Sequence, residues 1–185
     1  EAFFEVFTTI IVGYMMVMMG LVNRQAVTKV VYLAALLFLG SGLLGISHNF
    51  YWNAKPVGTL ALGSVFSTLQ VVPLILLTLE AWRMQRMPQL LARKSNENGR
   101  SSLFAMPGVF LYLLGVNFWN FFGAGVFGLI INLPIANYYE HGTYLTVNHG
   151  HAALMGVYGN LSIAGILFAI RYLTNSNTWN PRLVT

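Results

Sequence analysis

Two histidines lie two positions apart in the segment NHGHAAL, which contains His149 and His151 and leads into an apolar run. Each residue of an α-helix advances the chain by about 100°, so side chains two positions apart point roughly 200° apart. A regular helix therefore directs these imidazoles to two different centres on opposite sides, and not to one metal ion. Two flanking haems fit this arrangement, because imidazole is a common axial ligand of haem iron. The alternative is a pair of packing histidines that hydrogen-bond to neighbouring helices.

A third histidine, His48, ends an apolar run in the segment GISHNFYW, and the amide Asn49 follows it directly. Backbone geometry relaxes at a helix end, so neighbouring side chains there can bracket one ion. Imidazole suits iron, copper or zinc, whereas the neutral amide oxygen of asparagine is a harder and weaker donor. The alternative is a helix C-terminus where His48 caps carbonyl groups and Asn49 starts a turn.

Carboxylates and a fourth histidine are the remaining groups that could bind a metal, relay protons or anchor a cofactor. Glu1 and Glu5 are four residues apart and share one face of a helix. Inside a membrane such a pair can bind a metal, relay protons or stay neutral, and the alternative is solvation at a helix start. Glu140 and His141 are expected to be solvated, although together they can anchor anionic groups of a cofactor.

Composition places these residues in a membrane protein. Of 185 residues, 56% are hydrophobic and only 8% are charged, and the mean hydropathy is +0.64. A soluble domain of this size needs more charge to cover its surface. The chain has no cysteine, which excludes disulfides and thiolate-bound metals. It opens with EAFFEVF, without an initiator Met or the basic segment of a signal peptide, so we expect an internal piece of a longer polypeptide.

Five apolar stretches approach the length of roughly 20 residues that a membrane span needs. They predict an all-α integral membrane fold with transmembrane helices at residues 2–22, 30–50, 59–79, 109–133 and 145–173. Pro73 interrupts the third helix, which membrane helices tolerate when neighbours satisfy the freed carbonyl. The small-residue run GAGVFG in the fourth lets another helix approach closely.

Basic residues in the connecting loops predict the orientation. The first loop carries Arg24 and Lys29, and the third, a basic loop at residues 83–107, carries five basic residues against the single Glu97. The second loop has only Lys55, and the fourth has none. The positive-inside rule therefore puts the first and third loops in the cytoplasm and the other two outside. This topology explains the net charge of +5, so no nucleic-acid partner is expected.

The orientation brings the ionisable residues to one level near the outer side of the membrane. Such groups are costly within spans and usually face the interior of the bundle for a functional reason. All four histidines and three of the five carboxylates are expected at this level: His48, His141, His149, His151, Glu1, Glu5 and Glu140.

The segment HGTYLTVNHGHAALMGVYG resembles the tenth helix and preceding loop of the catalytic subunit of haem–copper oxidases. The segments NFWNFFGAGVFGLIINLP and EAFFEVF are similar to the nitric oxide reductase branch, especially its single-chain, quinol-linked members. The resemblance covers residues 1–185 as one catalytic region, helices six to ten of a twelve-helix bundle. It implies an oxidoreductase of the bacterial cytoplasmic membrane that acts on nitric oxide with two b-type haems and a non-haem iron, its active-site level toward the periplasm.

The resemblance also implies the haem ligands. His149 would be the proximal ligand of the high-spin haem, and His151 one axial ligand of the low-spin haem, whose second ligand comes from an early helix. His141 matches a position near the haem propionates.

For the non-haem iron, the resemblance implies His48 as a ligand, with Glu1 approaching the metal and Glu5 beside it. A further iron-binding histidine is expected four residues before Glu1. Asn49 departs from the family pattern, which has two consecutive histidines here. This change is associated with nitric oxide dismutases, relatives of the quinol-linked reductases that convert nitric oxide to dinitrogen and dioxygen. Asn49 would replace a strong donor with a weak one or leave a position open, altering the redox potential of the iron.

The leading hypothesis is therefore nitric oxide dismutation at a haem–iron pair. The alternative is quinol-dependent reduction to nitrous oxide, with Glu1 and Glu5 as proton relay groups. A transporter whose histidines relay protons predicts no haem. A respiratory oxygen reductase fits less well, because Glu5 occupies the region where those enzymes supply a tyrosine. A di-haem electron carrier explains His149 and His151 but leaves His48 unexplained.

Overall fold

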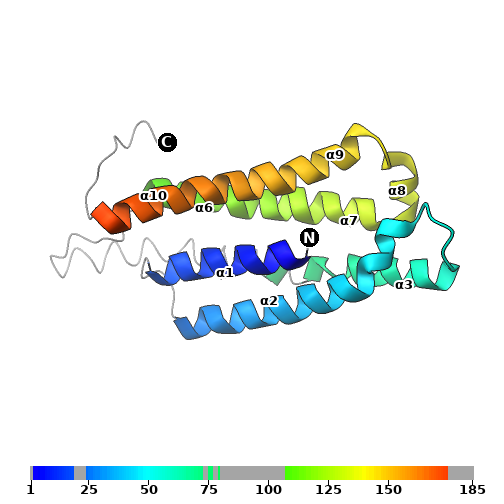
Figure 1. The fold of residues 1–185 in the computed structure, drawn as a ribbon, viewed down its shortest axis with the longest axis horizontal. Helices are drawn as coiled ribbons and strands as arrows, with labels where there is room; N and C mark the ends of the chain where they lie inside the picture. Colours follow the sequence, from blue (N-terminus) through cyan, green and yellow to red (C-terminus); the bar gives the residue numbers. More distant parts are fainter. Residues whose placement is uncertain (1, 19–23, 73–74, 77–78, 80–106, 175–185) are drawn as a thin grey trace.

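The computed structural model describes residues 2–18, 24–72, 75–76, 79 and 107–174, and the regular structure within them is helical (Figure 1). The elements follow in chain order as α1 (Ala2–Met18), α2 (Arg24–Gly45), the 3₁₀ turn η1 (Ile46–Phe50), α3 (Val57–Thr68), α6 (Pro107–Trp119), the π-helical segment η2 (Asn120–Val126), α7 (Phe127–Asn132), α8 (Pro134–Glu140), α9 (Tyr144–His151), the π-helical segment η3 (Ala152–Gly159) and α10 (Asn160–Thr174).

Three continuous rods are long and apolar enough to cross a membrane: Val27–Phe50, Gly108–Asn132 and Tyr144–Thr174. They coincide closely with three of the predicted spans, which confirms an all-α membrane fold. Val6–Met18 and Val57–Thr68 form shorter apolar helices, and the remaining parts of their predicted spans, at 2–22 and 59–79, lie partly outside the described residues. Prolines stand where a missing N–H costs nothing, since Pro107 and Pro134 open α6 and α8.

The helix α3 ends at Thr68, before its predicted span is complete. The carbonyl of Leu69 accepts a hydrogen bond from the N–H of Val72, three residues on, at 3.1 Å. In a regular helix its donor would be residue 73, which is a proline and has no N–H. Pro73 lies outside the described residues, and bonds between residues three apart already begin at Gln70, whose N–H donates to the carbonyl of Ser67 at 3.1 Å.

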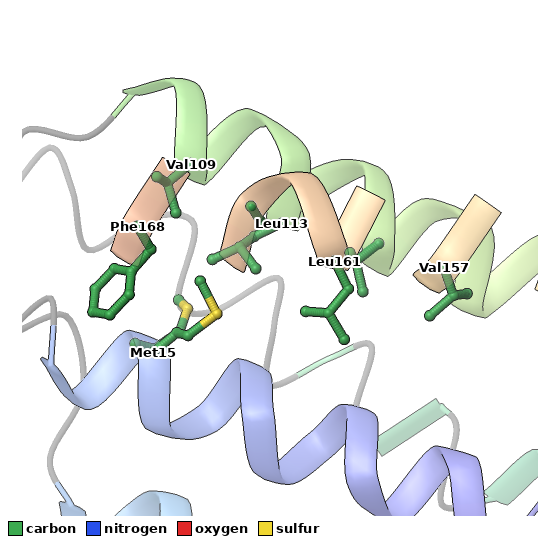
Figure 2. Packing of buried hydrophobic residues seen from close by; sticks show 9 residues of the cluster. Met15, Val109, Leu113, Val157, Leu161 and Phe168 are labelled. Atoms are coloured by element: carbon green, nitrogen blue, oxygen red, sulfur yellow. The ribbon is translucent and has the colours of Figure 1, made fainter. Parts of the chain in front are cut away.

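The main buried core joins α1 to the α6 and α9–α10 rods. Figure 2 shows Met15 of α1 reaching toward Leu113 of α6 and Phe168 of α10. The cluster consists of Met15, Met16, Val109, Leu113, Val116, Val157, Leu161, Ala164 and Phe168. A smaller cluster of Val6, Ala34 and Phe38 joins α1 to α2. Lipid tails are as apolar as these side chains, so close van der Waals packing, more than water exclusion, favours the contacts.

The two ends of the bundle carry different connections (Figure 1). The turn η1, the start of α3, the end of α7, α8 and the start of α9 lie at one end, and the close of α1, the start of α2 and the close of α10 lie at the other. The second and fourth predicted loops therefore share one end, as the alternation of spans requires. Which end faces the periplasm stays a prediction. α1 begins part-way along the bundle and not at the end that carries η1.

Candidate functional site

His149 is buried on the last turn of α9 and faces the π segment η2. Its Nδ1 lies 2.7 Å from the carbonyl oxygen of Gly123. A carbonyl can only accept, so Nδ1 carries the hydrogen and, in the neutral ring, Nε2 carries the lone pair. This is the arrangement of a metal-ligating histidine, whose other nitrogen donates to a fixed acceptor.

Glycines bring η2 close enough for this bond. A Cβ at Gly123 would lie 2.7 Å from the Cβ of Ala152, and one at Gly128 would lie 3.0 Å from Cε1 of His149. Both distances are shorter than ordinary contact: a Cβ at Gly123 would clash with Ala152, and one at Gly128 would press on the ring of His149. The expected close approach at the GAGVFG run is confirmed, and the approaching rod is the one that carries His149.

A cavity of about 260 Å³ opens beside His149. Part of its wall comes from the end of α3 and the residues that follow it. Ser67, in the last turn of α3, is buried, and its hydroxyl has no partner among the described residues. The cavity is also lined by Phe38, Gly125, Gly128, Asn132 and Gly150. An imidazole at the wall of a cavity to which three glycines contribute fits the axial ligation of a planar haem.

His151 lies on the other side of the same helix. It is exposed whereas His149 is buried, so the predicted opposite directions of the pair are confirmed. Its Nδ1 lies 2.9 Å from the carbonyl oxygen of Val147, one turn earlier. This bond again leaves the lone pair on Nε2, as an axial ligand to a second haem requires.

His48 and Asn49 both bond to carbonyls at the end of the α2 rod. Nδ1 of half-buried His48 lies 2.6 Å from the carbonyl oxygen of Gly45. Asn49 is exposed, and its Nδ2 donates to the carbonyl of Ile46 at 3.2 Å. Both side chains thus cap carbonyl groups at the end of the helix, as the alternative to metal binding expects for His48. For His48 this capping is compatible with a metal on Nε2, whereas Asn49 has only its amide oxygen to offer.

The carboxylates predicted for the iron are not placed beside His48. Glu1 lies outside the described residues, and Glu5 is described only as part of α1, without its side chain. In the part of the chain that the structure describes, no three His, Asp, Glu or Cys residues gather in a way that could hold a metal. The ligand set of His48, Asn49 and Glu1 therefore remains a prediction.

His141 lies at the same end of the bundle as η1, against an aromatic residue that sequence reasoning did not single out. The rings of His141 and Trp52 are 5.0 Å apart with a tilt of 33°. The indole N–H of Trp52 donates to Oδ1 of Asn137 at 2.9 Å. The available signal was weak: Asn132 lies near the end of an apolar span and Asn137 in the loop that follows, and only the structure shows that both are buried.

Comparison with known protein families matches residues 2–185 to cytochrome c and quinol oxidase polypeptide I. The chain is also 30% identical, over 170 residues, to a nitric oxide reductase subunit of Stutzerimonas stutzeri. That alignment covers 92% of this chain and 33% of the relative, so the chain spans about a third of the length of the curated relative it matches. The helical bundle and the family match agree that the chain belongs to the haem–copper oxidase superfamily.

Proposed function

We propose that the complete protein is a membrane oxidoreductase that dismutates nitric oxide to dinitrogen and dioxygen. Family membership and the likeness to a nitric oxide reductase subunit support nitric oxide as the substrate. The observation that carries the choice of dismutation is Asn49, which stands where the resemblance leads us to expect a second histidine.

His149, His151 and His48 each present Nε2 for a metal through a bond from Nδ1 to a carbonyl. When bound, two b-type haems and a non-haem iron supply the redox chemistry. The chain fixes the orientation of each imidazole, and apolar side chains, among them Phe38 and Val157, line the cavity beside His149. Exclusion of water strengthens electrostatic interactions within such a site.

Asn49 would offer the second metal a weaker donor than a histidine at the same position. Its amide nitrogen already donates to Ile46, and an amide oxygen binds iron less strongly than an imidazole does. Dismutation of two nitric oxide molecules to one dinitrogen and one dioxygen balances without external electrons or protons. A site with one imidazole fewer is therefore suited to a reaction in which the oxygen atoms leave as dioxygen and not as water.

Reduction to nitrous oxide is the second candidate, favoured by the 30% identity to the nitric oxide reductase of Stutzerimonas stutzeri. Two nitric oxide molecules then take up two electrons and two protons and give nitrous oxide and water. A quinol would supply the electrons, and Glu1 and Glu5 would relay the protons.

The two candidates separate in one assay on the full-length protein. Without any electron donor, ¹⁸O-labelled nitric oxide should give labelled dioxygen together with dinitrogen. The variant Asn49→His should lose dioxygen release and produce nitrous oxide only when a quinol is added. Nitrous oxide that depends strictly on the donor in the unmodified protein contradicts dismutation and favours the reductase.

A further inference from the structure

Side-chain hydrogen bonds tie the loop after η1 to the corner between α7 and α8. The hydroxyl of Tyr51 donates to the carbonyl of Asn132 at 2.7 Å, and the indole N–H of Trp52 donates to Oδ1 of Asn137 at 2.9 Å. The partners are separated by 81 and 85 residues in sequence. We call these four residues the clasp.

The hydrogen bond from Trp52 to Asn137 is fixed in its geometry by contacts of both residues. Its partner Asn137 is buried, and Nδ2 of Asn137 donates to the carbonyl of Ile131 at 3.0 Å, which directs Oδ1 to the indole. The indole ring also stacks on Tyr138, with centroids 5.8 Å apart and an interplanar angle of 22°. A tryptophan that is 51% exposed is thus fixed in position by a single buried acceptor and its ring neighbours.

The clasp joins the loop that follows His48 to α7 and α8, the two helices that lead into α9, which carries His149. Trp52 follows His48 by four residues, and Asn132 lines the cavity beside His149. The bond from His48 to Gly45 is local, so it orients the ring within η1 without relating it to the haem side. The clasp, in contrast, fixes the loop after η1 relative to α7 and α8.

We propose that Trp52 is a positioning residue for the metal pair. Through Asn137 it sets the distance and angle between His48 and His149 while it touches neither metal. The inference rests on the proposed function, because it concerns the iron that His48 holds when metal is bound. Hydrogen bonds that orient a ligand indirectly are known to change metal affinity, since a small displacement of the donor weakens every bond to the ion.

The test uses the purified full-length holoenzyme and the substitution Trp52→Phe, which keeps an aromatic ring but removes the N–H donor. After removal of non-haem iron by chelation, titration with Fe²⁺ should show an affinity about fivefold lower, the change expected for one hydrogen bond of ordinary strength. The haem absorbance should not change. The paramagnetic resonance signal of ferric high-spin haem, which weakens when a second paramagnetic iron lies close, should become stronger.

Asn137→Leu is the second variant; it removes the acceptor of Trp52 and also the bond to Ile131, so it should shift the affinity at least as far. The double variant should shift no further than Asn137→Leu alone, because that substitution already removes the bond from Trp52. The matched control is Tyr139→Phe on α8, whose exposed ring contacts Tyr138 and takes no part in the clasp. It should behave as the unmodified protein.

Each other result overturns the inference in a distinguishable way. Unchanged iron affinity and resonance signal in Trp52→Phe and Asn137→Leu overturn it and leave the proposed function standing. Additive shifts in the double variant, or a parallel loss of haem and thermal stability, reduce Trp52 to a structural role. Unmodified protein that holds haem but binds no Fe²⁺ overturns the metal pair, and with it both proposals.

Discussion

Each candidate ligand histidine donates from Nδ1 to a backbone carbonyl. His48 and His151 use carbonyls three and four residues earlier in their own helices, whereas His149 uses Gly123, 26 residues away on another rod. Every ring therefore has the same tautomer, with the lone pair on Nε2. The three rings differ in what orients them. The orientation of His149 depends on the packing of two rods, whereas those of His48 and His151 depend on a nearby turn.

Replacement of the two α9 histidines should remove two different haems. His149→Ala should abolish the high-spin haem spectrum, and His151→Ala the low-spin spectrum, each with little effect on the other, because the side chains lie on opposite faces of the helix. Optical and resonance spectra of the purified full-length variants measure both signals. Loss of both haem signals in equal measure from either variant would contradict separate sites.

At the scale of elements, π-helical segments interrupt both long rods next to His149. η2 lies within the rod that supplies Gly123, and η3 begins immediately after His151. A π turn widens the helix and often occurs at functional sites. Here the two segments pack against each other, and glycines provide the space at the contact.

Gly156 and Gly159 of η3 make a matched pair for testing how closely η3 packs against α6. A Cβ at Gly156 would lie 2.5 Å from Cγ of Trp119, whereas one at Gly159 would meet no atom within 4 Å. Gly156→Ala should therefore lower the free energy of unfolding by about 1–3 kcal/mol, the usual cost of overpacking. Gly159→Ala should change it by less than about 1 kcal/mol.

Thermal denaturation of the purified full-length variants in detergent measures the difference. Equal melting temperatures for Gly156→Ala and Gly159→Ala would show that η3 and α6 do not pack as closely as described.

At the scale of the whole molecule, the chain spans about a third of the length of the relative that it matches. Large apolar side chains remain exposed on α2 and α10, where bilayer lipid or further helices of the complete protein can pack. The predicted second ligand of the low-spin haem is likewise expected from a helix outside residues 1–185.

The predicted orientation can be measured by labelling, because this region contains no cysteine. Tyr139→Cys on α8, at a position that is 74% exposed, should react with an impermeant maleimide on intact spheroplasts. Ser95→Cys in the predicted cytoplasmic loop at 83–107 should react only after permeabilisation. The unmodified full-length protein serves as the control, and the reverse pattern would invert the topology.

The sequence by itself determined the membrane class and the opposite directions of His149 and His151. Few charges cannot cover a soluble surface, and the rotation per residue of a helix is constant, so both conclusions depend only on composition and local geometry. The spans of the long rods followed for the same reason. The early end of α3 was signalled by Pro73, although the sequence did not show that the break would line a cavity.

Only the tertiary structure decided which carbonyl accepts from His149, and that Ser67 and His149 line one cavity. It also brought Trp52 to Asn137, 85 residues away. These relations depend on the angles and offsets at which separate helices pack. Many nearly equivalent apolar faces compete for such contacts, so hydrophobic pattern alone does not select among them.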